Sequence, residues 1–190
     1  MDLVPSPSQT IGPFFHIYFD AKGVCGCIAG AEAKGEHIQL TCRVVDGDGV
    51  PIPDALIELW QTDAQGIFNH PADERHGNAD PAVLGFGRLP TDNEGICVFE
   101  TVRPGRIPAP AGSSYAPHIV VSVFGRGLLK RLVTRIYFAG DSANRDDSVL
   151  ALVSQGRRET LMAHPDSTRL GLWNFDIRLS GDDETVFFDV

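Results

Sequence analysis

The stretch "HIQLTCRVVDGDG" at residues 37–49 decides the fold of this chain. From Ile38 to Val44, apolar side chains occupy every second position and polar side chains lie between them. A period of two is typical of a β-strand with one buried face, and Asp-Gly pairs are typical of tight turns. The stretch therefore predicts a half-buried strand that ends in a turn.

Short β-rich runs of a similar kind follow along the rest of the chain, separated by Gly, Asp and Pro. Such runs at fairly even spacing predict an all-β fold, an antiparallel β-sandwich in a single domain. Only minor helical segments are expected, over residues 146–156 and in a turn at residues 157–163. The runs are residues 55–60, 96–102, 118–125, 132–140, 173–181 and 184–190.

Residues 1–36 differ from the rest and predict an extended N-terminal arm, which leaves residues 37–190 as the sandwich domain. Pro5, Pro7 and Pro13 exclude a long helix and disrupt strand ladders. The segment "IGPFFHIYF" is rich in aromatic residues, in which disordered tails are poor. We therefore expect the arm to be ordered and packed on another surface.

The composition argues against several classes of function. The formal charge is −9, from 25 acidic and 16 basic residues, and there is no basic run that would favour nucleic acid. An anionic substrate would therefore need a local cation to capture it. The sequence has no signal peptide and no apolar stretch long enough for a spanning helix, so a soluble, cytoplasmic protein without membrane contact is expected.

The sequence offers little for metal binding. The six histidines include no H-x-H and no H-x-x-x-H pair, and the four cysteines include no C-x-x-C pair. "DGDG" lacks the later oxygen ligands of a calcium loop. His118 begins an apolar strand with no second ligand two positions along, so spacing favours a hydrogen-bonded core residue. The cysteines are expected to be free thiols.

Two charged side chains remain. Arg126 comes directly after a strand and is flanked by Gly125 and Gly127, so its planar guanidinium group can form a bidentate pair with a carboxylate. The alternative is an arginine that is simply solvated in a loop. Glu58 lies in the middle of an apolar strand and is expected to form a structural ion pair, for instance with Arg135.

Taken in order along nearly the whole chain, several segments resemble the intradiol ring-cleaving dioxygenases. Among these they resemble the non-metal-binding alpha chains of heteromeric enzymes that use O₂ to cleave 3,4-dihydroxybenzoate between its hydroxylated carbons. The segments are "SQTIGPFFH", "DALIELWQTDAQG", "TDNEG", "VRPG", "APHIVVSVFGRG", "TRIYFAGD", "RRETL", "FDIRLSG" and "ETVFFD". The resemblance implies a β-sandwich, an alpha/beta hetero-oligomer and Fe(III) bound by the partner beta chain, with no organic cofactor.

In the iron-binding chains of the family, two histidines of an H-x-H on one strand bind the metal. The resemblance places His118 at the first histidine position and Val120 at the second. Tyr115 stands where the family has an arginine, three residues before the first histidine. Valine has no lone pair to give a metal. The resemblance therefore implies that His118 is vestigial and structural.

Two tyrosines complete the family's ligand set. One of these tyrosines aligns near Ile107 in "PGRIPAP" of this sequence. The other aligns with Arg75 or His76, because the alignment of this loop can shift by one residue. At most one of four ligands survives, and Fe(III) prefers anionic oxygen donors. We therefore expect no metal and no catalytic residue in this chain alone.

The resemblance assigns a different role to the arm and to Arg126. In the alpha chains, the threonine, glycine and proline of the "SQT-x-GP" segment line the partner's active-site cavity, and an arginine after the strand faces the substrate. Those positions are Thr10, Gly12, Pro13 and Arg126. A structural place in a turn is the simpler alternative for Thr10.

Two other functions remain open at this stage. One is a stand-alone β-sandwich binding module that has lost the iron chemistry. The other is a self-sufficient dioxygenase with unusual ligands, which the missing H-x-H disfavours.

Overall fold

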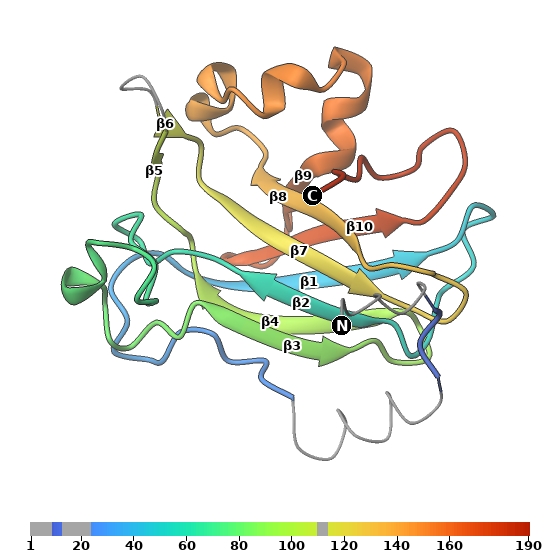
Figure 1. The fold of residues 1–190 in the computed structure, drawn as a ribbon, viewed down its shortest axis with the longest axis horizontal. Coiled ribbons are helices and arrows are strands. Elements are labelled where there is room, and N and C mark those ends of the chain that lie inside the picture. The colour runs from blue at the N-terminus through green and yellow to red at the C-terminus, as the bar shows by residue number, and fades with distance from the viewer. Residues whose placement is uncertain (1–8, 13–23, 110–113) are drawn as a thin grey trace, which may run out of the picture.

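The computed structural model describes residues 9–12, 24–109 and 114–190, in which ten strands form two sheets (Figure 1). The larger sheet has eight strands in the order β3-β2-β7-β8-β9-β10-β1-β4, and β5 (Ile107–Pro108) pairs with β6 (Ser114–Tyr115) beside it. The all-β prediction is confirmed. The eight strands are β1 (His37–Val45), β2 (Leu56–Trp60), β3 (Phe86–Pro90), β4 (Ile96–Val102), β7 (His118–Phe124), β8 (Leu132–Phe138), β9 (Met162–Pro165) and β10 (Leu172–Arg178).

The large sheet folds back on itself into a nearly closed barrel. Strand β9 pairs with both β8 and β10 and so joins the two layers. At the opposite side, residues 24–30 bridge the two end strands: Cys25 pairs with Arg88 of β3, and Cys27 pairs with Glu100 of β4. Residues 24–30 are therefore part of the barrel wall, whereas the packing of an arm on a partner subunit stays a prediction.

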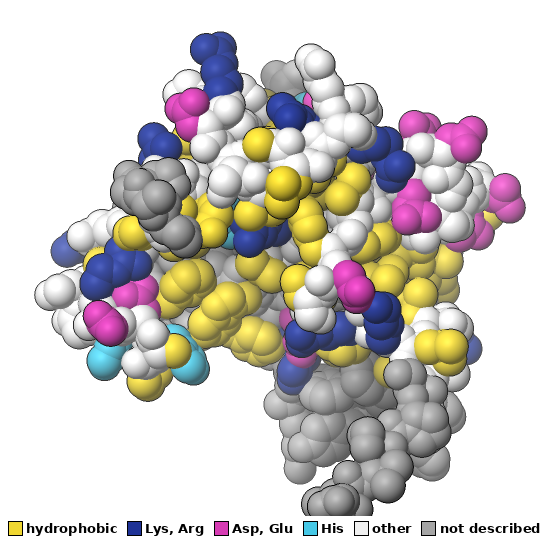
Figure 2. Space-filling view, turned by 45° about the horizontal axis from the view of Figure 1, so that its top comes forward, with side chains coloured by type: hydrophobic (Ala, Val, Ile, Leu, Met, Phe, Trp, Pro, Cys, Tyr) yellow, Lys and Arg dark blue, Asp and Glu magenta, His cyan; other side chains and the backbone are white. Residues whose placement is uncertain are grey.

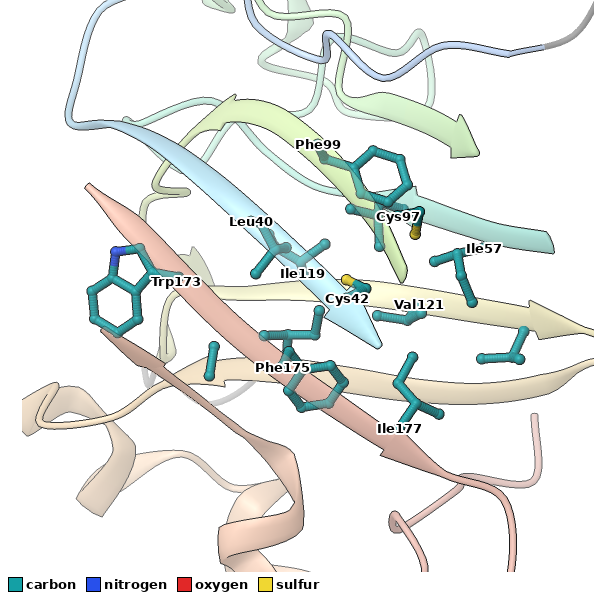
Figure 3. Packing of buried hydrophobic residues seen from close by; sticks show 14 of the residues in the cluster. Leu40, Cys42, Ile57, Cys97, Phe99, Ile119, Val121, Trp173, Phe175 and Ile177 are labelled. Carbon is teal, nitrogen blue, oxygen red and sulfur yellow. The ribbon is translucent and has the colours of Figure 1, made fainter. Parts of the chain in front are cut away.

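The core lies between the two layers, as Figure 3 shows. In β1 the alternate residues predicted to point inward are all buried, from Ile38 to Val44. Leu40 and Cys42 of this strand belong to the same buried cluster as Ile119 of β7 across the barrel. The period of two therefore predicts the inward face correctly.

Some elements differ from the prediction. Strands β1 and β10, and also β8 and β9, are parallel pairs, because alternation along one strand carries no information about the direction of its neighbour. Residues 184–190 form a single bridge, from Phe188 to Val133, instead of a strand.

The helical segments are short 3₁₀ helices rather than α-helices. They cover one end of the barrel beside β8 and β9 (Figure 1). They are η3 (Ser142–Asp146), η4 (Leu150–Leu152) and η5 (Gln155–Leu161), with η1 (His76–Asn78) in a separate loop. None of the helices in the described part of the chain is long and apolar enough to cross a membrane.

Candidate functional site

Arg126 lies in the loop that leaves β7, at the end of the barrel where β2 begins. The loop is closed by a hydrogen bond from the Leu128 N–H to the Gly125 carbonyl, at 3.2 Å. The Arg126 side chain is 70% exposed, and its Nη2 lies 3.8 Å from Asp54 Oδ2. Because a pair this exposed is worth less than about 1 kcal/mol, the guanidinium can readily exchange Asp54 for another carboxylate.

The structure brings the predicted arm residue Thr10 to the same loop. Thr10 Oγ1 accepts a hydrogen bond from the Gly127 N–H at 2.7 Å, across 117 positions of sequence. Among the residues that the structure describes, no atom lies within 4 Å of a Cβ added at Gly12, so Gly12 is open to the approach of another surface. Pro13 lies outside the described residues. Thr10 is thus bonded to the residue that follows Arg126, so two of the four predicted cavity residues lie at the same loop.

His118 lies at the start of β7 and is 4% exposed. Its Nδ1 donates to the Ala116 carbonyl at 2.8 Å, so the hydrogen-bonded histidine expected from the sequence is present. Its ring centroid lies 5.7 Å from that of Tyr137 and 6.2 Å from that of Tyr115. Burial, reinforced by the positive charge of Arg135, lowers the pKa of His118 to about 4. His118 is therefore neutral at physiological pH.

The low pKa of His118 makes stability depend on pH. The imidazole has a pKa near 6.5 when unfolded, so between pH 6.5 and pH 4 the unfolded chain binds a proton that the folded chain does not. We expect this group to cost up to about 3 kcal/mol of folding free energy as pH falls through that window. Below pH 4 both states are protonated and the loss stops growing.

The measurement is a pair of unfolding curves at pH 7 and pH 4.5 for the wild type and for His118→Gln, which cannot titrate. The variant should be less stable at pH 7 but lose less on acidification. A His118 ring titration by NMR with a midpoint near 6.5 would contradict the prediction.

The positions that the resemblance aligns with the family's iron ligands do not fit a ferric ion. Val120 and Ile107 offer no donor atom. At the position that aligns with Arg75 or His76, Arg75 is paired with Asp73, whose Oδ2 lies 2.8 Å from its Nη2, and His76 has its Nδ1 2.9 Å from the Asp73 carbonyl oxygen. Over the described ranges there is no group of three or more His, Cys, Asp or Glu side chains that could hold a metal.

A cavity of about 610 Å³ opens beside these positions. Trp60 and Phe68 form an aromatic wall, with their rings nearly parallel and 5.7 Å apart. Its lining includes Ile107, which aligns with one tyrosine ligand of the family, and Arg75, which is one of the two residues that can align with the other. Figure 2 shows apolar side chains gathered across the middle of one face of the molecule, with charged side chains around them. The complete lining is Trp60, Phe68, His70, Ala72, Asp73, Glu74, Arg75 and Ile107.

The predicted ion pair between Glu58 and Arg135 is wrong. Glu58 pairs instead with Arg88, which lies directly opposite on β3 and donates from Nε to Glu58 Oε1 at 2.7 Å. The sequence does not indicate this partner, because residues 86–90 lack the pattern of a strand. Arg135 lies near His118, with its Cζ 5.5 Å from the centre of the Tyr115 ring.

Asp147 is a buried residue at the end of the barrel that carries the helical segments. It is 1% exposed and joins the β6–β7 segment to the helical segment at the end of the barrel. Its two oxygens accept four hydrogen bonds, from the N–H groups of Ala116, Val149 and Leu150 and from the Tyr137 hydroxyl. The local sequence does not reveal the whole of this role, because two of the four donors, Ala116 and Tyr137, come from other elements of the chain.

Comparison with known proteins agrees with this geometry. Residues 19–181 match the family model described as "Dioxygenase". The chain is 43% identical to the protocatechuate 3,4-dioxygenase alpha chain of Burkholderia cepacia, over 99% of this chain and 98% of that one. It is 39% identical to the alpha chain of the Pseudomonas putida enzyme, over 100% and 98%.

A beta chain is also a relative. The protocatechuate 3,4-dioxygenase beta chain of Burkholderia cepacia is 36% identical, over 83% of this chain and 70% of that one. Among solved structures, 3-chlorocatechol 1,2-dioxygenase from Rhodococcus opacus 1CP has the same fold, with a TM-score of 0.65 and 19% identity over 93% of this chain and 67% of that one. The chain thus belongs to the intradiol dioxygenase family, as a homologue of the protocatechuate 3,4-dioxygenase alpha chain.

Proposed function

We propose that this chain is the alpha chain of a protocatechuate 3,4-dioxygenase and works in a heteromer with a beta chain. The complex uses O₂ to cleave 3,4-dihydroxybenzoate between its hydroxylated carbons, which gives 3-carboxy-cis,cis-muconate. The observation that carries the proposal is the 43% identity to an alpha chain along almost the full length of both proteins. The Fe(III) ion belongs to the beta chain, because the positions here that align with the family's iron ligands do not fit a ferric site.

The chain's own contribution is a cation presented to the partner's cavity. The substrate is an anion at neutral pH, whereas the chain carries a formal charge of −9, so capture needs a local positive group. Arg126 can supply this positive group, because its guanidinium is exposed and its planar geometry allows bidentate hydrogen bonds to a carboxylate. A charge-assisted pair of this kind is worth about 1.5–3 kcal/mol.

The arm supports this loop. Thr10 holds the backbone at Gly127 through its hydroxyl oxygen, so the arm and the arginine loop would enter the partner's cavity as one unit. Gly12 presents no side chain, which allows close approach of another surface. Pro13 is proposed to complete this lining.

The test is the iron content and visible absorption of the chain expressed alone and co-expressed with a beta chain. We expect a colourless, iron-free chain alone and a coloured complex with about one iron per alpha/beta pair, because ferric tyrosinate absorbs visible light. One tightly bound iron in the isolated chain would overturn the assignment of the metal to the partner. A stable monomer that does not bind the beta chain would favour a stand-alone binding module.

A further inference from the structure

The position beside His118 is filled by an arginine. Strands β7 and β8 pair in register, so that His118 lies opposite Tyr137 and Val120 lies opposite Arg135. Side chains of directly opposite residues project from the same face of a sheet. Arg135 therefore shares a face with His118, next to the position where the sequence lacks a second histidine.

The guanidinium of Arg135 is held in place by aromatic neighbours. Its Cζ lies 5.5 Å from the centre of the Tyr115 ring, within the range of a cation–π contact. Its Nη1 lies 3.5 Å from the Tyr137 hydroxyl oxygen, and that hydroxyl in turn donates to Asp147 at 3.1 Å. The cation is thus fixed from two sides, over Tyr115 and toward Tyr137.

The charge of Arg135 is not cancelled by a direct ion pair. Within the described ranges, Arg135 forms no salt bridge, and Asp147 is reached only through the Tyr137 hydroxyl. Glu58, which could have neutralised it, pairs with Arg88 instead. Because a guanidinium stays protonated at every physiological pH, the site carries a permanent positive charge.

His118 has a hydrogen-bond acceptor and lies on the same face of the sheet as Arg135. Its Nδ1 donates to Ala116, so the lone pair of the neutral ring is on Nε2. A neutral imidazole fixed by a backbone carbonyl is the usual state of a histidine ligand. The histidine alone would therefore still suit a metal, and the obstacle lies in what surrounds it.

We propose that Arg135 takes the place of the metal ion at this site, and that its fixed charge keeps the alpha chain free of iron so that the heteromer loads iron only in the beta chain. The inference rests on the proposed function. A second cation close to a guanidinium is repelled strongly where water is largely excluded. Loss of the donor atoms at Val120 and Ile107 would then be only part of the reason that this chain does not bind iron.

The experiment restores two donor positions in the full chain, co-expressed with the beta chain, and counts iron per alpha/beta pair. Val120→His with Ile107→Tyr is compared with the same pair of changes plus Arg135→Gln. We expect the variant that retains Arg135 to stay near one iron per pair, and the variant with Arg135→Gln to approach two. Titration with Co²⁺ should show at least a tenfold gain in second-site affinity from Arg135→Gln.

Two controls isolate the charge at this position. Arg135→Lys in the same background keeps the positive charge and should stay near one iron, whereas Arg131→Gln removes an exposed charge at the start of the same strand region and should change nothing. Equal iron uptake with Arg135 present or replaced overturns the inference, and so does no second iron in any variant that folds. A wild-type complex without iron would instead count against the proposed function.

Discussion

Replacing Arg126 by alanine in the assembled complex is expected to raise the KM for protocatechuate about 10- to 100-fold. The reason is the loss of a charge-assisted pair with the substrate carboxylate, worth about 1.5–3 kcal/mol. Plain catechol lacks that carboxylate, so its KM should change by less than about twofold. Steady-state kinetics on both substrates gives the comparison within one protein.

Arg126→Lys provides the matched variant. It keeps the charge but loses the planar fork, so the KM for protocatechuate should rise only part of the way. Because the side chain is 70% exposed and its contact with Asp54 is long, neither variant should change folding. An equal rise in KM for both substrates would mean that Arg126 only shapes the loop.

Asp147→Ala is expected to have the largest effect on stability, about 3–5 kcal/mol. The variant would leave three N–H groups, two of them buried, and the buried Tyr137 hydroxyl without their acceptor. These donors join the start of β7 to the helical segment, so the variant should also loosen the surroundings of His118. Urea unfolding of the complex measures the loss.

The neighbouring Asp146 is the matched control, since it is exposed while Asp147 is buried. Asp146→Ala removes the same charge from the same segment and should cost less than about 0.5 kcal/mol. If the two variants unfold at the same urea concentration, the four hydrogen bonds do not contribute as proposed.

The sequence was most informative where burial follows a simple period. Ile38 to Val44 point alternately inward because a strand with one buried face requires it, and the resulting core is visible in Figure 3. The period does not encode which strand lies alongside, so the parallel pairing of β1 with β10 could not be predicted.

The candidate site was less predictable, for a related reason. The residue types at Arg126 and Thr10 suggested a role, but their meeting through Gly127 depends on a contact across 117 positions. Glu58 was given the wrong partner because "FGRLP", with its glycine and proline, lacks the signature of a strand. Once β3 is in place, Arg88 lies closer to Glu58 than Arg135 does, and Arg135 is left beside His118.

The bridging of β3 and β4 by residues 24–30 also bears on how the chain associates. Cys25 exchanges both backbone hydrogen bonds with Arg88, while Glu100 donates to Gly26 and accepts from Ile28. Unpaired strand edges are templates on which other chains add strands and aggregate. Here the segment occupies both edges along these residues, so a partner cannot extend the sheet at this seam and must recognise side chains and loops instead. The same stretch protects the chain against edge-to-edge polymerisation before any partner arrives.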